Sequence, residues 1–392
     1  MRIKVVRGDF LVEERAKLAL VGAGPWAVYR VRKVGLSTLE VQTRLASRLK
    51  LARAQVAFPA LKDKDAVVVQ YVTLPTGLVE EIQEGGFTAR RMGYRRRRLS
   101  TSDLIGNLFT IVARDLQDDE APRLAQRLKA IGGEGVPNYF DVQRFGSFAP
   151  RWGYLGKAIL RRDAEGALRA YLTRAFLADP PSVRAFKRKA ESLWPDWTAM
   201  LQVAPKPSNF RSVLTYLVDH PGGYRKALDL IPQRLLSVYL SAYQSYLWNR
   251  IVVSYLGQFY ASHRARVSFL RIVSQSLPVH AKLSQRAVTM LRSMRIALPH
   301  HRAQFRPVQV ARSAREVLAK EQLPAAELKA RILTKAYLTE GNRPILLLPR
   351  AIKVDSPFPD RQFPGRSALR VHFALSRGSY ATLVLKAAAL TC

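Results

Sequence analysis

The chain has 392 residues and carries 64 Lys and Arg against 29 Asp and Glu, which gives a formal net charge of +35. Hydrophobic residues make up 48 % of the sequence, so a disordered basic tail is excluded and sizeable cores are expected, with two domains as the natural organisation at this length. The charge attracts polyanions, but it fits ribosomal proteins, histone-like proteins and DNA enzymes equally well.

Residue usage also bears on metals, disulfides and membranes. The single cysteine, Cys392, allows neither a disulfide framework nor a Cys-based zinc site, and the six histidines lack metal-site spacing. No apolar run reaches the roughly 20 residues that span a bilayer, and the N-terminal MRIKVVRGDF has no apolar signal core. We therefore expect a soluble, cytoplasmic protein with no metal, no membrane partner and, by default, a monomeric state.

The first predicted helix follows Ser37, which forms a capping-box spacing with Glu40. Apolar residues then recur on one helical face, at Val41, Leu45, Leu49 and Ala52. A second helix is predicted over Pro122 to Ile131, ended by Gly132 and Gly133.

Runs rich in β-branched and aromatic residues predict strands that begin at Val67, Leu108, Leu369 and Tyr380. Strands and helices therefore interleave in an α+β pattern. The stretch from about residue 152 to 335 differs, because it is rich in helical segments and Arg and has few clear strands. We expect this stretch to form a separate domain.

The segment LKDKDAVVVQ, residues 61–70, places Asp63 between Lys62 and Lys64, just before the β-branched run that starts at Val67. Its carboxylate is therefore expected at the mouth of a strand. A free aspartate is ionised at neutral pH and is available as a nucleophile or base. An isolated KDK sequence would more simply be a solvated turn.

The segment GVPNYFDVQRFG, residues 135–146, presents Asn138, Tyr139 and Phe140 after a proline and ends in Gln143 and Arg144. An amide, flat rings and a cation are the side-chain types that hydrogen-bond and stack on an extruded RNA base. An acid in one segment and a base-holding loop in another together indicate chemistry on a nucleotide.

These two segments resemble the signature stretches of the TruD family of RNA pseudouridine synthases, which read approximately GxKDKxAxTxQ and GxPNYFGxQRFG. Further similar segments follow in the expected order: DFLVEE at 9–14, Lys33 with GLSTLE, DLIGNLFTIVARDL at 103–116, LSAYQSYLWN at 240–249 and GSYATLVL at 378–385. The largest departure is Asp141 in place of a glycine, which could demand an altered turn. LSAYQSYLWN is assigned to packing and domain geometry.

The resemblance implies a mixed-sheet pseudouridine-synthase catalytic domain interrupted by a largely helical TRUD-type domain. We predict residues 1–155 and 341–392 for the catalytic domain and residues 156–340 for the inserted domain. The interleaved strands at both ends of the chain agree with this division.

The resemblance further implies that Asp63 is the essential carboxylate and that Lys62 stabilises developing negative charge. Phe140 would stack on the flipped uracil, and Asn138 would orient the loop or bind the nucleotide. The remaining implied substrate contacts are Phe10, Gln70 and Arg144. The RNA-binding residues expected are Lys33 and the densest positive patch of the chain, for which a solvated basic loop is the alternative: Arg90, Arg91, Arg95, Arg96, Arg97 and Arg98.

The function implied by the resemblance is isomerisation of a specific uridine, of the uridine-13 type in tRNA, to pseudouridine, with RNA as the partner and no cofactor. A catalytically silent, basic RNA-binding protein or RNA chaperone of the same fold is the alternative. The presence of Lys62 and Asp63 favours the enzyme.

Overall fold

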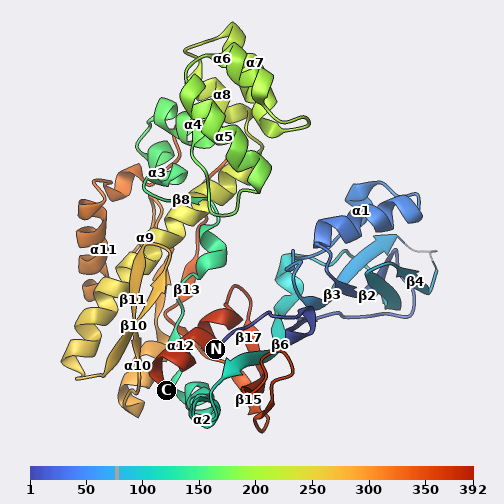
Figure 1. The fold of residues 1–392 in the computed structure, drawn as a ribbon, viewed down its shortest axis with the longest axis vertical. Helices are drawn as coiled ribbons and strands as arrows, with labels where there is room; N and C mark the ends of the chain where they lie inside the picture. The colour runs from blue at the N-terminus through green and yellow to red at the C-terminus, as the bar shows by residue number, and fades with distance from the viewer. Residues whose placement is uncertain (76–78) are drawn as a thin grey trace. The chain divides into compact units, whose positions relative to one another are not determined.

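The computed structural model describes residues 1–75 and 79–392. It divides into two compact units (Figure 1): a first unit of Met1–Val136 with Leu347–Cys392, and a second unit of Pro137–Leu346. The sequence predicts the first boundary after residue 155, later than the structure has it, and the second boundary after residue 340, earlier than the structure has it. The PNYF segment belongs to the second unit because its main chain is hydrogen-bonded there, as described below. Equating the two units with a catalytic and an inserted domain stays a prediction.

A nine-stranded mixed sheet forms the centre of the first unit. Its strands run in the order β15 (Arg350–Val354), β17 (Ser367–Ser376), β6 (Leu104–Leu116), β1 (Phe10–Ala16), β3 (Val67–Pro75), β2 (Trp26–Val34), β5 (Phe87–Arg95) and β4 (Glu81–Glu84), with β16 (Phe358–Pro359) paired to β17. β1 and β3 are parallel, whereas the other neighbours are antiparallel. The predicted α+β class is confirmed.

Three of the four predicted strands are confirmed as β3, β6 and β17. β17 pairs with β6 in antiparallel register, with Val371 opposite Ile111, so the C-terminal segment completes a sheet begun near the N-terminus. The two strands approach so closely that a Cβ on Gly106 would lie 2.1 Å from the carbonyl oxygen of Leu375. Only glycine permits this approach.

The helix predicted after Ser37 is confirmed as α1 (Thr38–Arg48). Its capping box is complete, because Ser37 Oγ accepts the Glu40 N–H at 3.1 Å and Glu40 Oε2 accepts the Ser37 N–H at 2.6 Å. Val41 and Leu45 are fully buried in a core formed with β2 to β5, whereas Leu49 and Ala52 lie beyond the helix.

The predicted end of the second helix is wrong. α2 (Glu120–Glu134) runs through Gly132 and Gly133 and ends at Gly135, whose φ of +73° is the left-handed conformation that a C-terminal glycine provides.

The strand predicted from Tyr380 is also wrong, because residues 381–391 form the helix α12 (Ala381–Thr391). A short apolar run fits a buried strand and a buried helix equally well by periodicity alone. Here the three consecutive alanines from Ala387 favour a helix, and α12 packs against α2.

The second unit is largely helical and is organised on the 30-residue helix α9 (Gln233–Ser262). Buried residues occur all around α9, as expected for a helix enclosed by other elements. The other helices are α3 (Leu155–Leu160), α4 (Ala164–Thr173), α5 (Pro181–Leu193), α6 (Trp197–Val203), α7 (Asn209–Asp219), α8 (Tyr224–Leu230), α10 (Gln285–Ser293) and α11 (Val308–Lys320).

Strands in the second unit form two-stranded pairs: β8 (Phe148–Ala149) with β9 (Gly153–Tyr154), β10 (Val267–Ile272) with β11 (Gln275–His280), and β12 (Arg295–Ala297) with β13 (Asn342–Pro344). This agrees with the scarcity of strand signals in the sequence. Across the described part of the chain, no helix has the length and apolar character required to cross a membrane.

Candidate active site

Three strand ends meet at one edge of the sheet in the first unit. β1 and β3 are parallel, with Leu11 opposite Val67, so both begin at this edge. β2 is antiparallel to β3, with Val34 opposite Val67, so β2 ends there. The segment before β1, the loop before β3 and the turn after β2 are therefore brought together, and this loop carries Asp63.

Asp63 forms an ion pair with Lys4, whose Nζ lies 2.8 Å from Asp63 Oδ2. The Asp63 side chain is 26 % exposed, so it remains accessible to a substrate. Lys4 Nζ also lies 4.4 Å from the centre of the Phe10 ring. Lys4 has a φ of +58°, a strained conformation for a residue other than glycine, and such strain is concentrated at functional sites. Sequence reasoning missed Lys4.

Lys62 points to a second carboxylate. Its Nζ lies 2.8 Å from Glu14 Oε1 and 2.7 Å from Asn107 Oδ1. Glu14 is completely buried and Lys62 is 11 % exposed by side chain, so this pair is shielded from solvent. Glu14 Oε2 also accepts the Tyr71 N–H at 3.2 Å. The pair fixes the loop against β1 and β6, in addition to any effect of its charge on a substrate.

Lys33 and Gln70 lie beneath this loop with no exposed surface. Gln70 Oε1 accepts a hydrogen bond from Thr38 Oγ1 at 3.3 Å, and Thr38 Oγ1 accepts the Lys62 N–H at 2.9 Å. The sequence assigned Lys33 to RNA and Gln70 to substrate. The structure instead directs both side chains toward the start of α1, where they have no surface to offer either ligand.

In the second unit, Asn138 is a buried anchor of the PNYF segment, with 1 % of its surface exposed. Its side-chain N–H donates to the Pro344 carbonyl at 3.0 Å, and its main-chain N–H donates to the Ile345 carbonyl at 2.8 Å. Arg343 donates to the Asn138 side-chain oxygen at 2.7 Å and to its carbonyl at 2.8 Å. Through these bonds Asn138 holds the main chain of the PNYF segment in place.

Phe140 is held through its main chain by α9. Its N–H donates to Asn249 Oδ1 at 2.9 Å, and its carbonyl accepts from Asn249 Nδ2 at 3.0 Å. Its ring, 6 % exposed, packs edge-to-face on Trp248 at 5.5 Å. The guanidinium carbons of Arg343 and Arg144 lie 4.1 and 5.4 Å from the ring centre.

LSAYQSYLWN therefore does more than pack: its last two residues position Phe140. Arg343 and Asn249 were missed because neither stands in a motif with Asn138 or Phe140.

Asp141 begins the short helix η4 (Val142–Phe145), and its Oδ1 accepts the Val142 N–H at 2.8 Å. The residue is 2 % exposed. An aspartate at this position thus caps the turn, which accounts locally for the departure from the family pattern.

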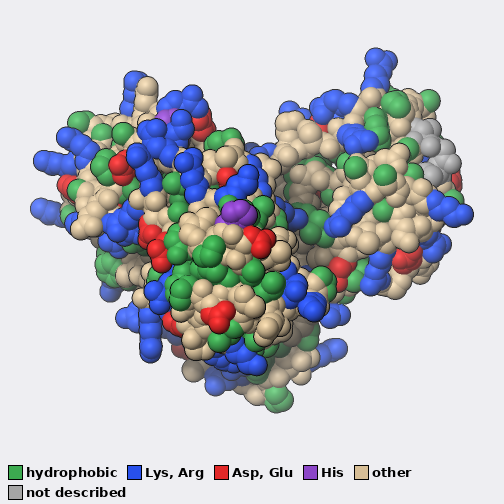
Figure 2. Space-filling model, turned by 90° about the horizontal axis from the view of Figure 1, so that it is seen from above, with side chains coloured by type: hydrophobic (Ala, Val, Ile, Leu, Met, Phe, Trp, Pro, Cys, Tyr) green, Lys and Arg blue, Asp and Glu red, His purple; other side chains and the backbone are tan. Residues whose placement is uncertain are grey.

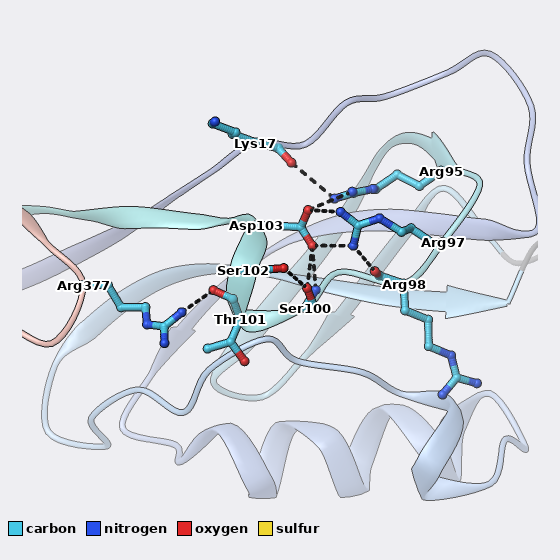
Figure 3. Close-up of polar contacts among 9 residues, drawn as sticks. All are labelled: Lys17, Arg95, Arg97, Arg98, Ser100, Thr101, Ser102, Asp103 and Arg377. Carbon is cyan, nitrogen blue, oxygen red and sulfur yellow. Dashed lines mark hydrogen bonds and ion pairs between the residues drawn. The ribbon is translucent and has the colours of Figure 1, made fainter. Parts of the chain in front are cut away.

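The arginine run does not act as one surface patch (Figure 3). Arg95 is 4 % exposed and donates to Asp103 Oδ1 at 3.1 Å, and Arg97 donates to both Asp103 oxygens at 3.0 and 2.7 Å. Arg98 is exposed, lies 4.0 Å from the centre of the Trp26 ring and donates to the Ala54 carbonyl. Arg95 is thus a buried structural residue and has no surface for a phosphate.

Arg91 pairs with Glu80 at 2.8 Å. Arg90 and Arg96 are exposed and form no side-chain hydrogen bond or ion pair with any described residue. Of the six arginines predicted to contact RNA, these two have guanidinium groups that are not already used within the protein.

The ion pairs and hydrogen bonds of Asp103 should make the stability of the fold depend on pH in the acid range. Burial would raise the pKa of Asp103, but hydrogen bonds from the Ser100 N–H, Arg97 and Arg95 outweigh burial and hold the pKa well below its ordinary value. Its folded pKa is below its unfolded pKa, so its stabilising contribution is complete at neutral pH and declines as the pH falls below about 4.

Asp103→Asn should lower the free energy of unfolding by about 3–5 kcal/mol at pH 7, because Arg95 loses its buried partner, and the difference from the parent should shrink in acid. Urea unfolding at pH 7 and pH 3 measures both effects. The exposed Asp119→Asn provides the control. A loss of the same size at both pH values would contradict this account.

The surface is strongly basic, as Figure 2 shows for one face, where Lys and Arg are far more numerous than Asp and Glu. Within residues 1–75 and 79–392, no group of three or more His, Cys, Asp or Glu side chains is arranged to hold a metal ion.

Comparisons with known proteins agree on one family. The family model described as tRNA pseudouridine synthase D (TruD) matches residues 1–388. The probable tRNA pseudouridine synthase D 2 of Methanocaldococcus jannaschii is 26 % identical over all of this chain and 92 % of its own length. The probable tRNA pseudouridine synthase D of Methanopyrus kandleri is 28 % identical over 97 % of this chain and 89 % of its own.

The fold is similar to the crystal structure of the putative tRNA pseudouridine synthase D from Methanosarcina mazei. The TM-score is 0.72 at 23 % identity, over 98 % of this chain and 92 % of that one. A family match over nearly the whole chain, a mixed sheet that presents the KDK loop and a solved structure of the same fold lead to one conclusion: this chain belongs to the TruD family of tRNA pseudouridine synthases, isomerases that act on RNA.

Proposed function

We propose that Asp63 is the essential carboxylate with which this enzyme isomerises uridine-13 of tRNA to pseudouridine. The observation that carries the proposal is a partly exposed carboxylate, paired with the Lys4 ammonium at 2.8 Å, on a loop fixed where β1, β2 and β3 meet. Preorganised groups of this kind act on a reacting atom without reorganising during the reaction.

The reaction requires no outside atoms or electrons. The C1′–N1 bond breaks, the detached uracil turns in place, C5 joins C1′, and the proton lost from C5 is balanced by the proton gained at N1. Attack on the sugar, attack on the base and removal of a sugar proton all require an anionic oxygen. Lys4 donates to Asp63 Oδ2 at 2.8 Å and orients that oxygen.

Phe140 is the proposed stacking partner of the uracil, and stacking on an aromatic ring contributes roughly 1–3 kcal/mol per base. Because the ring is 6 % exposed, this role requires the base to displace a side chain that lies near it, such as Arg144. The bonds from Asn249 and Asn138 to main-chain groups support this role, because they fix the loop that carries the ring. Arg144, which lies over the Phe140 ring, is the proposed cation of the same loop.

The proposed RNA surface of the first unit includes Arg90 and Arg96. Replacing both with alanine should weaken tRNA binding and lower the log–log salt slope by about 1.4, since each single-strand phosphate contact contributes about 0.7. Titrations from 50 to 300 mM salt measure the slope. Lys50→Ala, with an exposed Lys on the same unit, is a control for charge removal. An unchanged slope in the double variant would remove these residues from the RNA surface.

The choice of uridine-13 follows the resemblance to the TruD family and is tested separately from the chemistry. Purified protein should convert uridine-13 in a tRNA transcript and leave the same transcript unmodified when cytidine replaces that uridine. Conversion of a different uridine would reject the position while retaining the carboxylate. A transcript that is unmodified at every uridine would reject the position and support the RNA-binding alternative.

A further inference from the structure

Lys33, near the end of β2, is buried without a contacting carboxylate. Its side chain has no exposed surface, and its Nζ lies 2.6 Å from the Leu36 carbonyl oxygen and 2.5 Å from the Asp63 carbonyl oxygen. In the described part of the chain it forms no ion pair. The buried ammonium is therefore satisfied by main-chain carbonyls alone.

Burial opposes the charge of a lysine in this position. Burial lowers the pKa of Lys33 to about 8, while the negative charges of Asp63 and Glu40 act in the opposite direction and the positive charge of Lys62 acts with burial. Burying an ammonium costs free energy, which here is offset by its hydrogen bonds to the Leu36 and Asp63 carbonyl oxygens. Packing alone does not account for this residue.

The contacts of Lys33 point to a role in the loop. The backbone of residues 62–63 is tied down at two points: Lys62 N–H donates to Thr38 Oγ1 at 2.9 Å, and the Asp63 carbonyl accepts from Lys33. The same ammonium binds the Leu36 carbonyl in the turn before α1. Lys33 thus ties the main chain at Asp63 to the strand and helix beneath it.

We propose that Lys33 is a positioning residue for the catalytic aspartate: its buried ammonium binds the main-chain carbonyl of Asp63, fixes the loop that carries the carboxylate, and does not itself touch RNA. This rests on the proposed role of Asp63. A displacement of about 1 Å between a catalytic group and its target can cost on the order of 100-fold in rate. Losing the tie at Asp63 should therefore reduce turnover without reducing binding.

The test is Lys33→Met, which keeps the length and volume of the side chain and removes the ammonium. We expect kcat to fall about 10- to 100-fold and the Kd for tRNA to stay within about twofold. Lys64→Met is the matched control, because Lys64 lies in the same loop but is exposed and paired with Glu40. This control should retain the parent kcat.

Hydrogen exchange gives a readout that does not depend on activity. Lys33→Met should accelerate exchange of the backbone amides in residues 61–66, whereas Lys64→Met should not. If Lys33→Met does not fold, Lys33→Gln, which retains a shorter donor, is judged by the same criteria.

An unchanged kcat with unchanged exchange would overturn the proposal, and so would weaker tRNA binding with kcat preserved. If Asp63→Asn is inactive while Lys33→Met is fully active, only the positioning role fails. If the parent modifies no RNA, the proposed function fails and the exchange measurement alone decides the role of Lys33 in the loop.

Discussion

Asp63→Asn should abolish pseudouridine formation, with a loss of at least about 10³-fold in kcat, while the Kd for tRNA stays within about twofold. Removing a group that acts directly on the reacting atoms costs far more than removing a binding contact. Asparagine keeps the shape of the side chain and can still accept from Lys4 Nζ, so the loop should stay folded. The substitution removes the anionic oxygen and little else.

Single-turnover conversion of a tRNA transcript measures the rate, and filter binding measures the affinity. Asp65→Asn is the matched control, because Asp65 lies in the same loop and its side chain is exposed. It should behave like the parent. Equal turnover of Asp63→Asn and the parent would show that another group supplies the essential carboxylate.

Asn249→Ala should destabilise the second unit by about 2–6 kcal/mol. The side chain is completely buried and satisfies both the N–H and the carbonyl of Phe140, and each buried main-chain group left without a partner costs about 1–3 kcal/mol. Because the same bonds fix Phe140, kcat should fall as well.

Urea unfolding followed by tryptophan fluorescence suits this measurement, because four of the five tryptophans lie in the second unit: Trp152, Trp194, Trp197 and Trp248. Asn209→Ala, which changes an exposed asparagine of the same unit, should shift the midpoint little. A shift in Asn249→Ala no larger than in this control would contradict the proposed anchoring of the PNYF segment.

Much of this fold could be predicted because local signals agreed with the final structure. Ser37 and Glu40 predict the start of α1 through a chemistry that acts within one turn, and the β-branched run at Val67 predicts β3 directly. The wrong strand at Tyr380 arose where a short apolar run carries no decisive periodicity. The end of α2 was predicted too early because the helix continues through Gly132 and Gly133, and Gly135 provides the C-terminal cap.

Motifs in the sequence single out Asp63 and Phe140 as candidate residues, and their roles stay proposals. Lys4 could not be predicted as the partner of Asp63, because only the parallel pairing of β1 with β3 brings residues 59 positions apart together. Arg343 reaches Asn138 from 205 positions away for a similar reason. Motifs indicate candidate groups, whereas the contacts that support these groups depend on tertiary structure.

Burial corrected the predicted RNA contacts in the same way. A lysine at position 33 and an arginine at position 95 look in the sequence like the other cations of a basic protein, but both are withdrawn from solvent. Arg95 forms a buried ion pair with Asp103, and Lys33 binds the main chain of the loop that carries Asp63.

The most direct test of the central claim is a map of pseudouridine in total tRNA after incubation with the purified parent protein and, separately, with Asp63→Asn, with no cofactor added. The parent should convert one uridine per substrate tRNA, and the variant should bind the same tRNAs and convert none. Conversion of that uridine by the variant, or a map left unchanged by the parent, would contradict the assignment of the reaction to this carboxylate.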